Sequence, residues 1–300
     1  MIVYLDQNKW IELARIVHGK EQSKHAKAIL YALNAATESG CILPLSAMHY
    51  MEAARISNTD RRARLGSVMW KYSKGNTLTS YPDVVRHEVE VALSNYFPSV
   101  VPSDNFALLG RGVSHAFGEH RTSNFPPEIE EEIERSMLTG NSRLNIDPLS
   151  FKNGEHRENF FTHLGSLHKT KEDLPKSKWE NWLYGMALAD IRNPLAEVMR
   201  RHHIELEAFE SLGEAQLKAI VDAMPTRHLD LHLHRQVLRN PNYKAKITDL
   251  EDWAGVGVAS CYCDVVVCEK HMADMIRRDR FQVKARIETN LADIFQTIPA

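Results

Sequence analysis

The first fifteen residues of the chain constrain its fold more than any other stretch. The apolar run from Ile2 to Leu5 stops at Asp6, and an amphipathic pattern begins soon afterwards at Trp10. That order predicts a buried strand, an acidic residue at its carboxyl end, and a helix directly after it. In open α/β sheets the carboxyl ends of the strands are where ligands bind. We therefore ask whether other carboxylates reach the same edge of the sheet.

The N-terminal segment alternates between strand and helix patterns. Residues 24–37 carry apolar side chains at helical spacing, and Gly40 stands where a helix commonly ends. Residues 41–45 form a short apolar run, and Ser46 is a suitable N-cap for a helix over 47–56. This β-α-β-α order predicts an α/β fold with a parallel sheet and right-handed crossovers.

The middle of the chain has a different character from its two ends. Helical patterns cover residues 59–72, 81–96, 126–138, 176–203 and 212–224, and a loop pattern covers 138–151. The α/β pattern returns with helices over 225–238 and 249–260, a strand over 264–268, a helix over 269–276, and a final strand and helix from 287. We predict a discontinuous α/β domain, residues 1–58 plus 225–300, interrupted by a mostly helical insertion, residues 59–224.

Composition excludes several classes of protein. The net charge of −2 excludes a polybasic nucleic-acid binder, although local basic patches remain compatible with it. No apolar run approaches the roughly 18 residues of a membrane span, and no secretory signal is visible, so we expect a cytoplasmic protein with no membrane partner. Three of the four cysteines, Cys261, Cys263 and Cys268, lie within eight residues, which favours free thiols near a buried strand over a disulfide framework or a zinc knuckle.

Acidic residues stand at several element boundaries. Asp6 ends the first strand, Glu52 lies on the helix after the second, Asp249 and Asp252 open a late helix, and Glu269 follows the last clear strand. A parallel sheet would bring these positions to one edge, where unpaired carboxylates repel one another. Mg²⁺ or Mn²⁺, which prefer oxygen ligands, would relieve that repulsion. Such an ion can activate water for attack on a phosphodiester.

The same residues resemble those of the PIN domain family, a metal-dependent ribonuclease fold. MIVYLDQNKW is similar to the start of a PIN domain, and DLEDWAGVGVASCYCDVVVCEKHM resembles its late helix and strand. The resemblance implies that Asp6, Glu52, Asp252 and Glu269 are the catalytic acids, with metal held by Asp6, Glu52 and Asp252. The resemblance covers about residues 1–58 and 225–285. The segment LDQNKWIELAR is also similar to a PIN-like bacterial subgroup often found near defence and toxin loci.

The fourth acid departs from the family pattern. Cys268-Glu269 stands where the family has a Thr-x-Asp motif, so Asp264 and Asp249 compete with Glu269 as metal ligands. Each acid also has a structural alternative. Asp6 and Asp249 are suitable helix caps, Asp252 and Glu269 suit a first helical turn, and Glu52 could pair with Arg55.

Other side chains are weaker candidates for the same site. Asn8 and Ser46 could support the first carboxylate or a metal-bound water, although a turn role suits Asn8 equally. Basic residues cluster after Glu52 and after Glu269, and Arg55, Arg62 and Lys270 are the candidates for contacts with substrate phosphates. Surface charges that only aid solubility would give the same pattern.

We therefore expect a Mg²⁺- or Mn²⁺-dependent endoribonuclease acting on RNA, in keeping with a toxin or phage-defence effector. An antitoxin or sensor protein, or a homo-oligomer, is compatible with this expectation. One alternative is a non-catalytic PIN-fold adaptor that acts through its helical insertion. Another is a metal-independent nuclease, because Arg227 and His232 match the short signature of HEPN ribonucleases.

Overall fold

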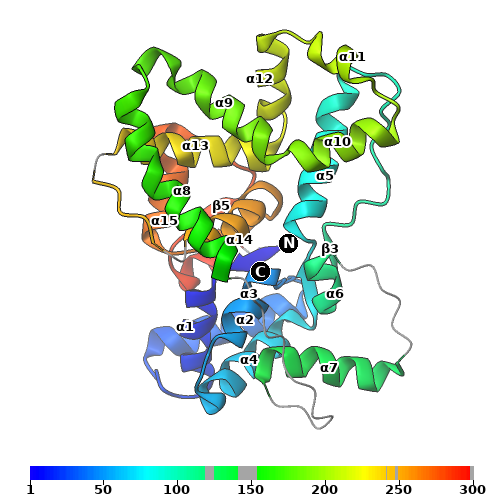
Figure 1. The fold of residues 1–300 in the computed structure, drawn as a ribbon. Helices are drawn as coiled ribbons and strands as arrows, with labels where there is room; N and C mark the ends of the chain where they lie inside the picture. Colours follow the sequence, from blue (N-terminus) through cyan, green and yellow to red (C-terminus); the bar gives the residue numbers. More distant parts are fainter. Residues whose placement is uncertain (119–124, 141–153, 241, 247–248, 298–300) are drawn as a thin grey trace.

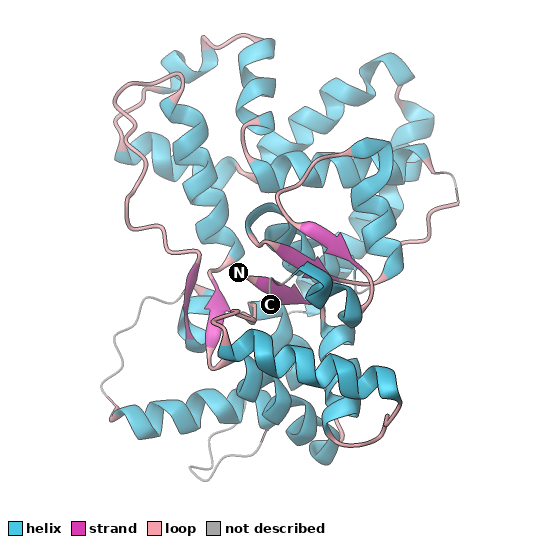
Figure 2. Cartoon of the chain, turned by 180° about the vertical axis from the view of Figure 1, so that it is seen from behind, coloured by secondary structure: helices cyan, strands magenta, loops and turns pink. Residues whose placement is uncertain are grey.

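The computed structural model describes residues 1–118, 125–140, 154–240, 242–246 and 249–297. Most of this part of the chain is helical, and a small parallel sheet lies among the helices (Figures 1 and 2). Among the helices described, none is both long enough and apolar enough to cross a membrane. The predicted loop over 138–151 lies largely outside the described residues.

Three short parallel strands form the central sheet in the order β1-β4-β5. They are β1 (Val3–Leu5), β4 (Val265–Val267) and β5 (Arg286–Glu288). Tyr4 stands opposite Val266, which stands opposite Ile287. The parallel sheet expected from the sequence is confirmed, and valine-rich β4 is its middle strand, as suits a strand buried on both faces.

Isolated bridges extend the sheet on the other side of β1. Ile2 bridges Ile42 in parallel, and Leu45 bridges Thr77, which belongs to β2 (Asn76–Leu78). β2 also pairs antiparallel with β3 (Leu109–Arg111). The strand expected over 41–45 is therefore reduced to single bridges. From β1 the chain continues to one side of that strand and returns much later on the other side at β4, so the topological switch point lies between β1 and β4.

Side chains of the sheet alternate between two helical layers. Val3, Leu5 and Val267 share a core with α1 (Gln7–Val17), α2 (Lys24–Glu38) and α4 (Thr59–Ser73). Tyr4 and Val266 face the opposite core, which includes α13 (Pro225–Arg239) and α14 (Asp249–Tyr262). This two-residue period produces a sheet covered by helices on both faces.

The predicted boundary at residue 59 does not coincide with a boundary between cores. Leu65 and Met69 of α4 and Leu138 of α7 (Pro127–Thr139) are buried in the same core as β1. A Cβ on Gly66 would lie 2.7 Å from the Leu138 backbone, so glycine is what lets these two helices approach. The N-terminal core thus extends into the segment predicted as an insertion.

The remaining helices lie around the sheet, and those between residues 179 and 222 gather at one end of the molecule (Figure 1). They are α3 (Ala47–Ala54), α5 (Tyr81–Ser94), α6 (Gly112–Phe117), α8 (Gly154–Asp173), α9 (Trp179–Asp190), α10 (Arg192–Arg201), α11 (Leu206–Glu210), α12 (Glu214–Asp222) and α15 (Lys270–Arg277), with 3₁₀ turns η1 (Lys176–Lys178), η2 (Arg278–Arg280) and η3 (Leu291–Thr297). The single helix expected over 176–203 is broken at Ile191, because Pro194 cannot donate to the carbonyl of Asp190. Helix α8 was not expected.

Candidate active site

Asp6 stands at the junction between β1 and α1. Its backbone N–H donates to the Val267 carbonyl at 2.9 Å, which continues the ladder between β1 and β4. Its Oδ1 accepts the Gln7 N–H at 2.8 Å and caps α1. The side chain is 7% exposed, so the carboxylate is almost enclosed at the carboxyl end of the sheet.

Glu269 comes from the neighbouring strand to the same place. It follows β4 after one residue, Cys268, and occupies the N-cap position of α15. Its Oε1 accepts a hydrogen bond from the Asn8 side-chain amide. Asp6 and Glu269 thus flank the switch point of the sheet, which is where open α/β sheets bind ligands.

The carboxyl group of Asp6 is only partly compensated by its surroundings. Burial raises its pKa to about 6, and the negative charge of Glu269 adds to the effect, while the N–H groups of Gln7 and Glu269 and the positive charge of Lys9 oppose it. The Lys9 ammonium itself pairs with Glu12 at 3.3 Å. Among the described residues no lysine or arginine lies within ion-pair distance of Asp6. A hard divalent cation would supply the missing positive charge, and carboxylates are the ligands it prefers.

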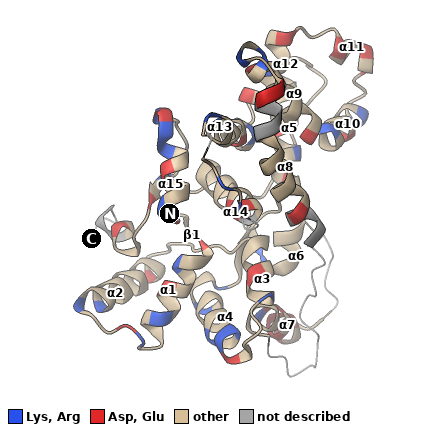
Figure 3. Cartoon of the chain, turned by 60° about the vertical axis from the view of Figure 1, so that its left-hand side comes forward, with Lys and Arg blue, Asp and Glu red and all other residues tan. Residues whose placement is uncertain are grey.

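Glu52 and Asp252 approach the same end of the sheet from two helices. Half-buried Glu52 on α3 acts with Asp6 to raise the pKa of the Tyr4 hydroxyl, on which burial has the largest effect. Asp252 on α14 acts with Asp6 on the Cys268 thiol, whose pKa is raised to about 12, chiefly by burial. Glu52 and Asp252 also each have interactions of their own. Figure 3 shows acidic segments of α3, α14 and the end of β1 near one another.

These acids do not form a closed cage. Within the described ranges, no group of three or more His, Cys, Asp or Glu side chains is arranged to hold a metal ion. The arrangement is a close pair, Asp6 and Glu269, with Glu52 and Asp252 farther out. A pair of this kind suits Mg²⁺, which keeps several waters and commonly binds through one or two carboxylates and substrate phosphates.

His49 and Ser46 hold α3 against the end of β1. The Ser46 N–H donates to His49 Nδ1 at 2.9 Å, and His49 Nε2 donates to the Leu5 carbonyl at 2.9 Å. Burial lowers the pKa of His49 to about 4, so the ring is neutral and bridges two backbone groups. The Ser46 hydroxyl bonds to the Tyr4 hydroxyl at 3.0 Å, so Ser46 supports Tyr4 and α3 instead of the Asp6 carboxylate.

Asp264 and Asp249, the competing candidates for the fourth acid, are held by other groups. Asp264 precedes β4, and its carboxylate accepts the Ile2 N–H at 2.8 Å at the amino end of the sheet. A three-residue strand, about 10 Å long, separates it from the Asp6 end. Asp249 is 4% exposed and accepts from the Tyr243 hydroxyl and the Lys246 N–H, both at 2.8 Å. The direction of β4 therefore places Asp264 outside the site, and two local hydrogen bonds engage the Asp249 carboxylate.

A basic groove begins beside Glu52. One cavity of about 300 Å³ contains Gln7, Glu52 and Arg55, and a neighbouring cavity of about 550 Å³ continues between α1 and α4. Both are lined by Ile11, Asn58 and Arg61, which makes them one continuous groove. Its cations are Arg15, Lys20, Arg55, Arg61 and Arg64, and Glu52 is its one carboxylate among the described residues.

Most of these cations are available to a ligand. Arg15, Lys20, Arg61 and Arg64 are exposed, and none has a carboxylate partner in the part of the chain that the structure describes. Lys and Arg lie on α1 and α4 in Figure 3. Sequence reasoning placed Arg55 here but missed the α1 contribution, because Arg15 and Lys20 join the groove only when α1 packs on α4.

Two other predicted phosphate contacts differ in their surroundings. Lys270 is exposed on α15, next to Glu269. Arg62 is 7% exposed, and its guanidinium donates to the Leu138 carbonyl at 3.2 Å and the Met137 carbonyl at 2.7 Å. Its charge therefore neutralises the carboxyl end of α7 and does not face the groove.

The HEPN-like pair does not share a site. His232 donates from Nε2 to the Met275 carbonyl at 3.0 Å and stacks on Phe281 with ring centroids 4.3 Å apart. Arg227 lines a separate cavity that His232 does not reach. Five residues apart on one helix, the two side chains point in different directions.

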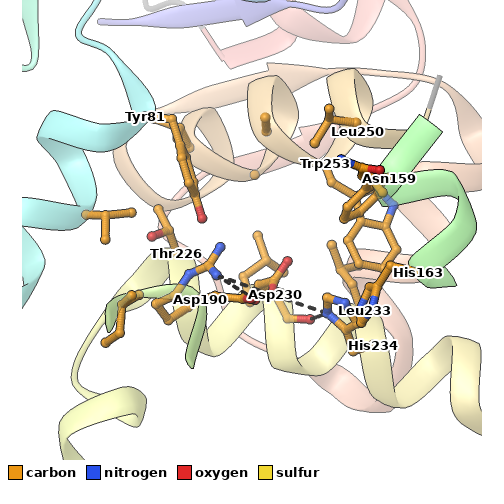
Figure 4. A pocket seen from close by; sticks show the side chains of 18 residues that line it. Tyr81, Asn159, His163, Asp190, Thr226, Asp230, Leu233, His234, Leu250 and Trp253 are labelled. Atoms are coloured by element: carbon orange, nitrogen blue, oxygen red, sulfur yellow. Dashed lines mark hydrogen bonds and ion pairs between the residues drawn. The ribbon is translucent and has the colours of Figure 1, made fainter. Parts of the chain in front are cut away.

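Sequence reasoning missed that separate cavity altogether. It has a volume of about 550 Å³ and lies among α5, α8, α13 and α14 (Figure 4). Arg227, Asp230 and His234 recur on α13 at a spacing of three and then four residues, which places them on one helical face. That spacing was the available signal, but the residues facing them come from distant segments.

Comparisons with known proteins identify no relative. No protein-family model, no curated protein and no solved structure matches this chain.

Proposed function

We propose that this chain is a PIN-like, Mg²⁺- or Mn²⁺-dependent endoribonuclease with Asp6 and Glu269 at the centre of its active site. The observation that carries the proposal is the carboxylate pair at the switch point between β1 and β4. Asp6 is buried, has a pKa raised to about 6, and has no lysine or arginine at ion-pair distance among the described residues. Buried carboxylates are normally paired with a cation. Glu269 is exposed beside Asp6, so a cation from solvent can reach both carboxylates.

The basic groove supports a polyanionic substrate. Its cations extend from the Glu52 end of the site along α1 and α4. Phosphate contacts of this kind position a nucleic acid without reading its sequence. A phosphodiesterase needs an acidic pair beside a basic groove. The metal would balance the negative charge of the acids, and the basic groove would balance the negative charge of the substrate.

Each residue of the site has a defined task in this proposal. Asp6 and Glu269 supply oxygen ligands, and Asn8 orients the Glu269 carboxylate through its amide. His49 fixes the end of β1 by bonding the Leu5 carbonyl. A bound divalent cation would lower the pKa of a coordinated water and stabilise charge on the phosphate. Glu52 and Asp252 are placed to bond waters around that ion.

The direct test is cleavage of labelled single-stranded RNA by the full chain, with the same sequence as DNA in parallel. We expect cleavage with Mn²⁺ or Mg²⁺ and none in EDTA. Asp6→Asn and Glu269→Gln should each lower the rate by about 100-fold or more, since even indirect partners of a metal site cost 10- to 100-fold.

Asp264→Asn is the matched control, because it removes the same charge at the opposite end of the sheet and should change the rate less than about twofold. Cleavage that persists in EDTA, or full activity in Asp6→Asn, would contradict the proposal. Tight RNA binding without cleavage in any metal would favour the adaptor alternative.

A further inference from the structure

The cavity among α5, α8, α13 and α14 is a second, fully built pocket. α13 contributes Asp230 and His234, α14 contributes Trp253, and α5 contributes Tyr81 from the opposite side (Figure 4). Its volume of about 550 Å³ falls within the range of small-molecule sites. None of the acids proposed for the active site lines it.

Arg227 is the most unusual group in this pocket. Its side chain is only 9% exposed, and its Nη1 lies 3.7 Å from Asp190 and 3.6 Å from Asp230. These are ion-pair distances, and within the described residues the guanidinium makes no hydrogen bond. Its Nε is fully enclosed without a partner. A guanidinium carries five N–H donors, and leaving them unsatisfied in a buried site is costly.

His234 offers a second unpartnered atom. Its Nδ1 donates to Asp230, whose carbonyl lies at 2.9 Å and whose carboxylate lies at 3.2 Å. Its Nε2 is enclosed and has no hydrogen-bond partner in the part of the chain described, and the residue is 2% exposed. Arg227 and His234 line the cavity from one helical face, although these two atoms are themselves enclosed. The Nη groups of Arg227, which make no hydrogen bond within the described residues, are the donors that a ligand in the cavity can use.

The walls and charges of the pocket narrow the chemistry of its ligand. Trp253 and Phe160 provide aromatic surface and meet edge to face with centroids 5.5 Å apart. The ring of Tyr81 lies under the Arg227 guanidinium, 5.3 Å from centroid to Cζ, and so helps to hold that group in place. Aromatic walls favour a flat ligand. Asp190 and Asp230 on either side of Arg227 disfavour a phosphate, because two carboxylates would repel it. The ligand must instead present donors to carboxylates beside an acceptor for Arg227.

We infer that this cavity binds a guanine base. Guanine carries the O6 and N7 acceptors, which arginine recognises, next to N1–H and N2–H donors that a carboxylate accepts. Adenine reverses this order, with a donor at N6 beside an acceptor at N1, and would place its acceptor against a carboxylate. The inference rests on the pocket alone and does not depend on the nuclease proposal.

Calorimetric titration of the full chain tests this inference and also distinguishes two sources of the base. One arm uses guanosine, a second uses adenosine, and a third uses a single-stranded RNA hexamer with one guanine against its all-uridine counterpart. We expect guanosine to bind about tenfold or more tightly than adenosine. Binding of the guanine hexamer without binding of guanosine would assign the site to a base within a strand. Equal affinity for guanosine and adenosine would overturn the inference. So would a result in which neither guanosine nor the guanine hexamer binds more tightly than its counterpart.

Two variants locate the binding. Arg227→Gln removes the charged donors, and Asp190→Asn removes a carboxylate whose side chain is 49% exposed and therefore tolerant of change. Each should weaken guanosine binding about tenfold or more. Arg239→Gln, on the same helix with a 56% exposed side chain outside the cavity, is the control and should bind as the unmodified chain does. Circular dichroism checks folding, and unchanged affinity in folded Asp190→Asn and Arg227→Gln would overturn the assignment.

Discussion

Two regions of the molecule shift the pKa of a buried aspartate in opposite directions. One is the strand-end site, formed by Asp6 and Glu269, and the other is the α13 cavity, lined by Arg227, Asp230 and His234. At the strand end, burial and the charge of Glu269 raise the pKa of Asp6 to about 6. In the cavity, burial also opposes ionisation of Asp230, but the charges of His234 and Arg227 outweigh it and hold its pKa at about 2. Among the described residues, the first site has no cation at ion-pair distance from its aspartate, whereas the second contains Arg227 and His234.

This difference indicates what each site needs from outside. In the proposed function, a metal ion would supply positive charge at the strand end, and a nucleic acid would supply negative charge to the neighbouring groove. The cavity is balanced in charge but not in hydrogen bonds, so it requires a neutral polar ligand. The role of a buried aspartate therefore depends on whether a cation lies beside it in the folded chain.

Changing aspartate to asparagine in each of the two sites should alter stability in opposite directions. Asp230→Asn should lower the free energy of unfolding by about 3 kcal/mol, because breaking a buried ion pair leaves Arg227 and His234 without their counter-charge. Urea denaturation at pH 7 measures it. A loss below about 1 kcal/mol would mean that the cavity charges are better solvated than their burial suggests.

Asp6→Asn should have the opposite sign. In EDTA at pH 8 it should raise the free energy of unfolding by about 1 to 3 kcal/mol, because asparagine still caps α1 and no longer buries a charge. The pKa of Asp6 is higher in the folded chain, so the cost of ionisation appears as the pH rises through about 6. Below about pH 4 the two chains should have equal stability, and destabilisation by Asp6→Asn at pH 8 would contradict a carboxylate that is only partly compensated.

His49, which bonds to the Leu5 carbonyl at the end of β1, gives the strand end a second pH dependence. Its pKa is about 4 in the folded chain, below the ordinary value, so the unfolded chain binds the proton more readily. The stability that neutral His49 contributes is complete above about pH 6.5 and is lost as the pH falls toward 4, a loss of at most about 3 kcal/mol. His49→Gln should flatten this part of the stability profile, measured by urea denaturation at pH 7 and 4.5. His18→Gln, an exposed control, should leave the profile unchanged.

The smallest expected effect concerns the groove. Reversing the charge of Arg61 and Arg64 together should weaken binding of single-stranded RNA about tenfold and reduce the salt dependence of that binding. Fluorescence anisotropy at several salt concentrations measures both. Arg135→Glu, a 47% exposed arginine on α7 outside the groove, is the control. Equal affinity for RNA in the double variant and the control would contradict a role of the groove in RNA binding.

The strand-end site could be predicted because its signals are local. An apolar strand that stops at Asp6, and a valine run followed by Glu269, predict two carboxylates at strand ends. That these two strands are neighbours is known only from the structure. The helix boundaries near the N-terminus followed for the same reason, as with α2, expected over 24–37 and observed over Lys24–Glu38. Each of these elements is defined by its own residues.

The cavity and the packing of the middle segment depend on contacts between distant residues. Asp190 enters the cavity because Pro194 breaks the helix after it, and Tyr81 arrives from α5, more than a hundred residues earlier. Gly66 allows α4 and α7 to touch, which joins the predicted insertion to the N-terminal core. Such contacts leave no periodic signal in one sequence, so neither the cavity nor the true extent of that core could be predicted.

The proposal that Asp6 and Glu269 hold a metal ion is tested by Mn²⁺ binding to the full chain. Electron paramagnetic resonance measures the free ion at pH 7.5 without substrate. The account predicts that the unmodified chain and Asp264→Asn bind Mn²⁺ equally, and that Asp6→Asn and Glu269→Gln bind it at least about tenfold more weakly. Equal Mn²⁺ affinity in the unmodified chain and Asp6→Asn would contradict the assignment of the strand-end pair as a metal site.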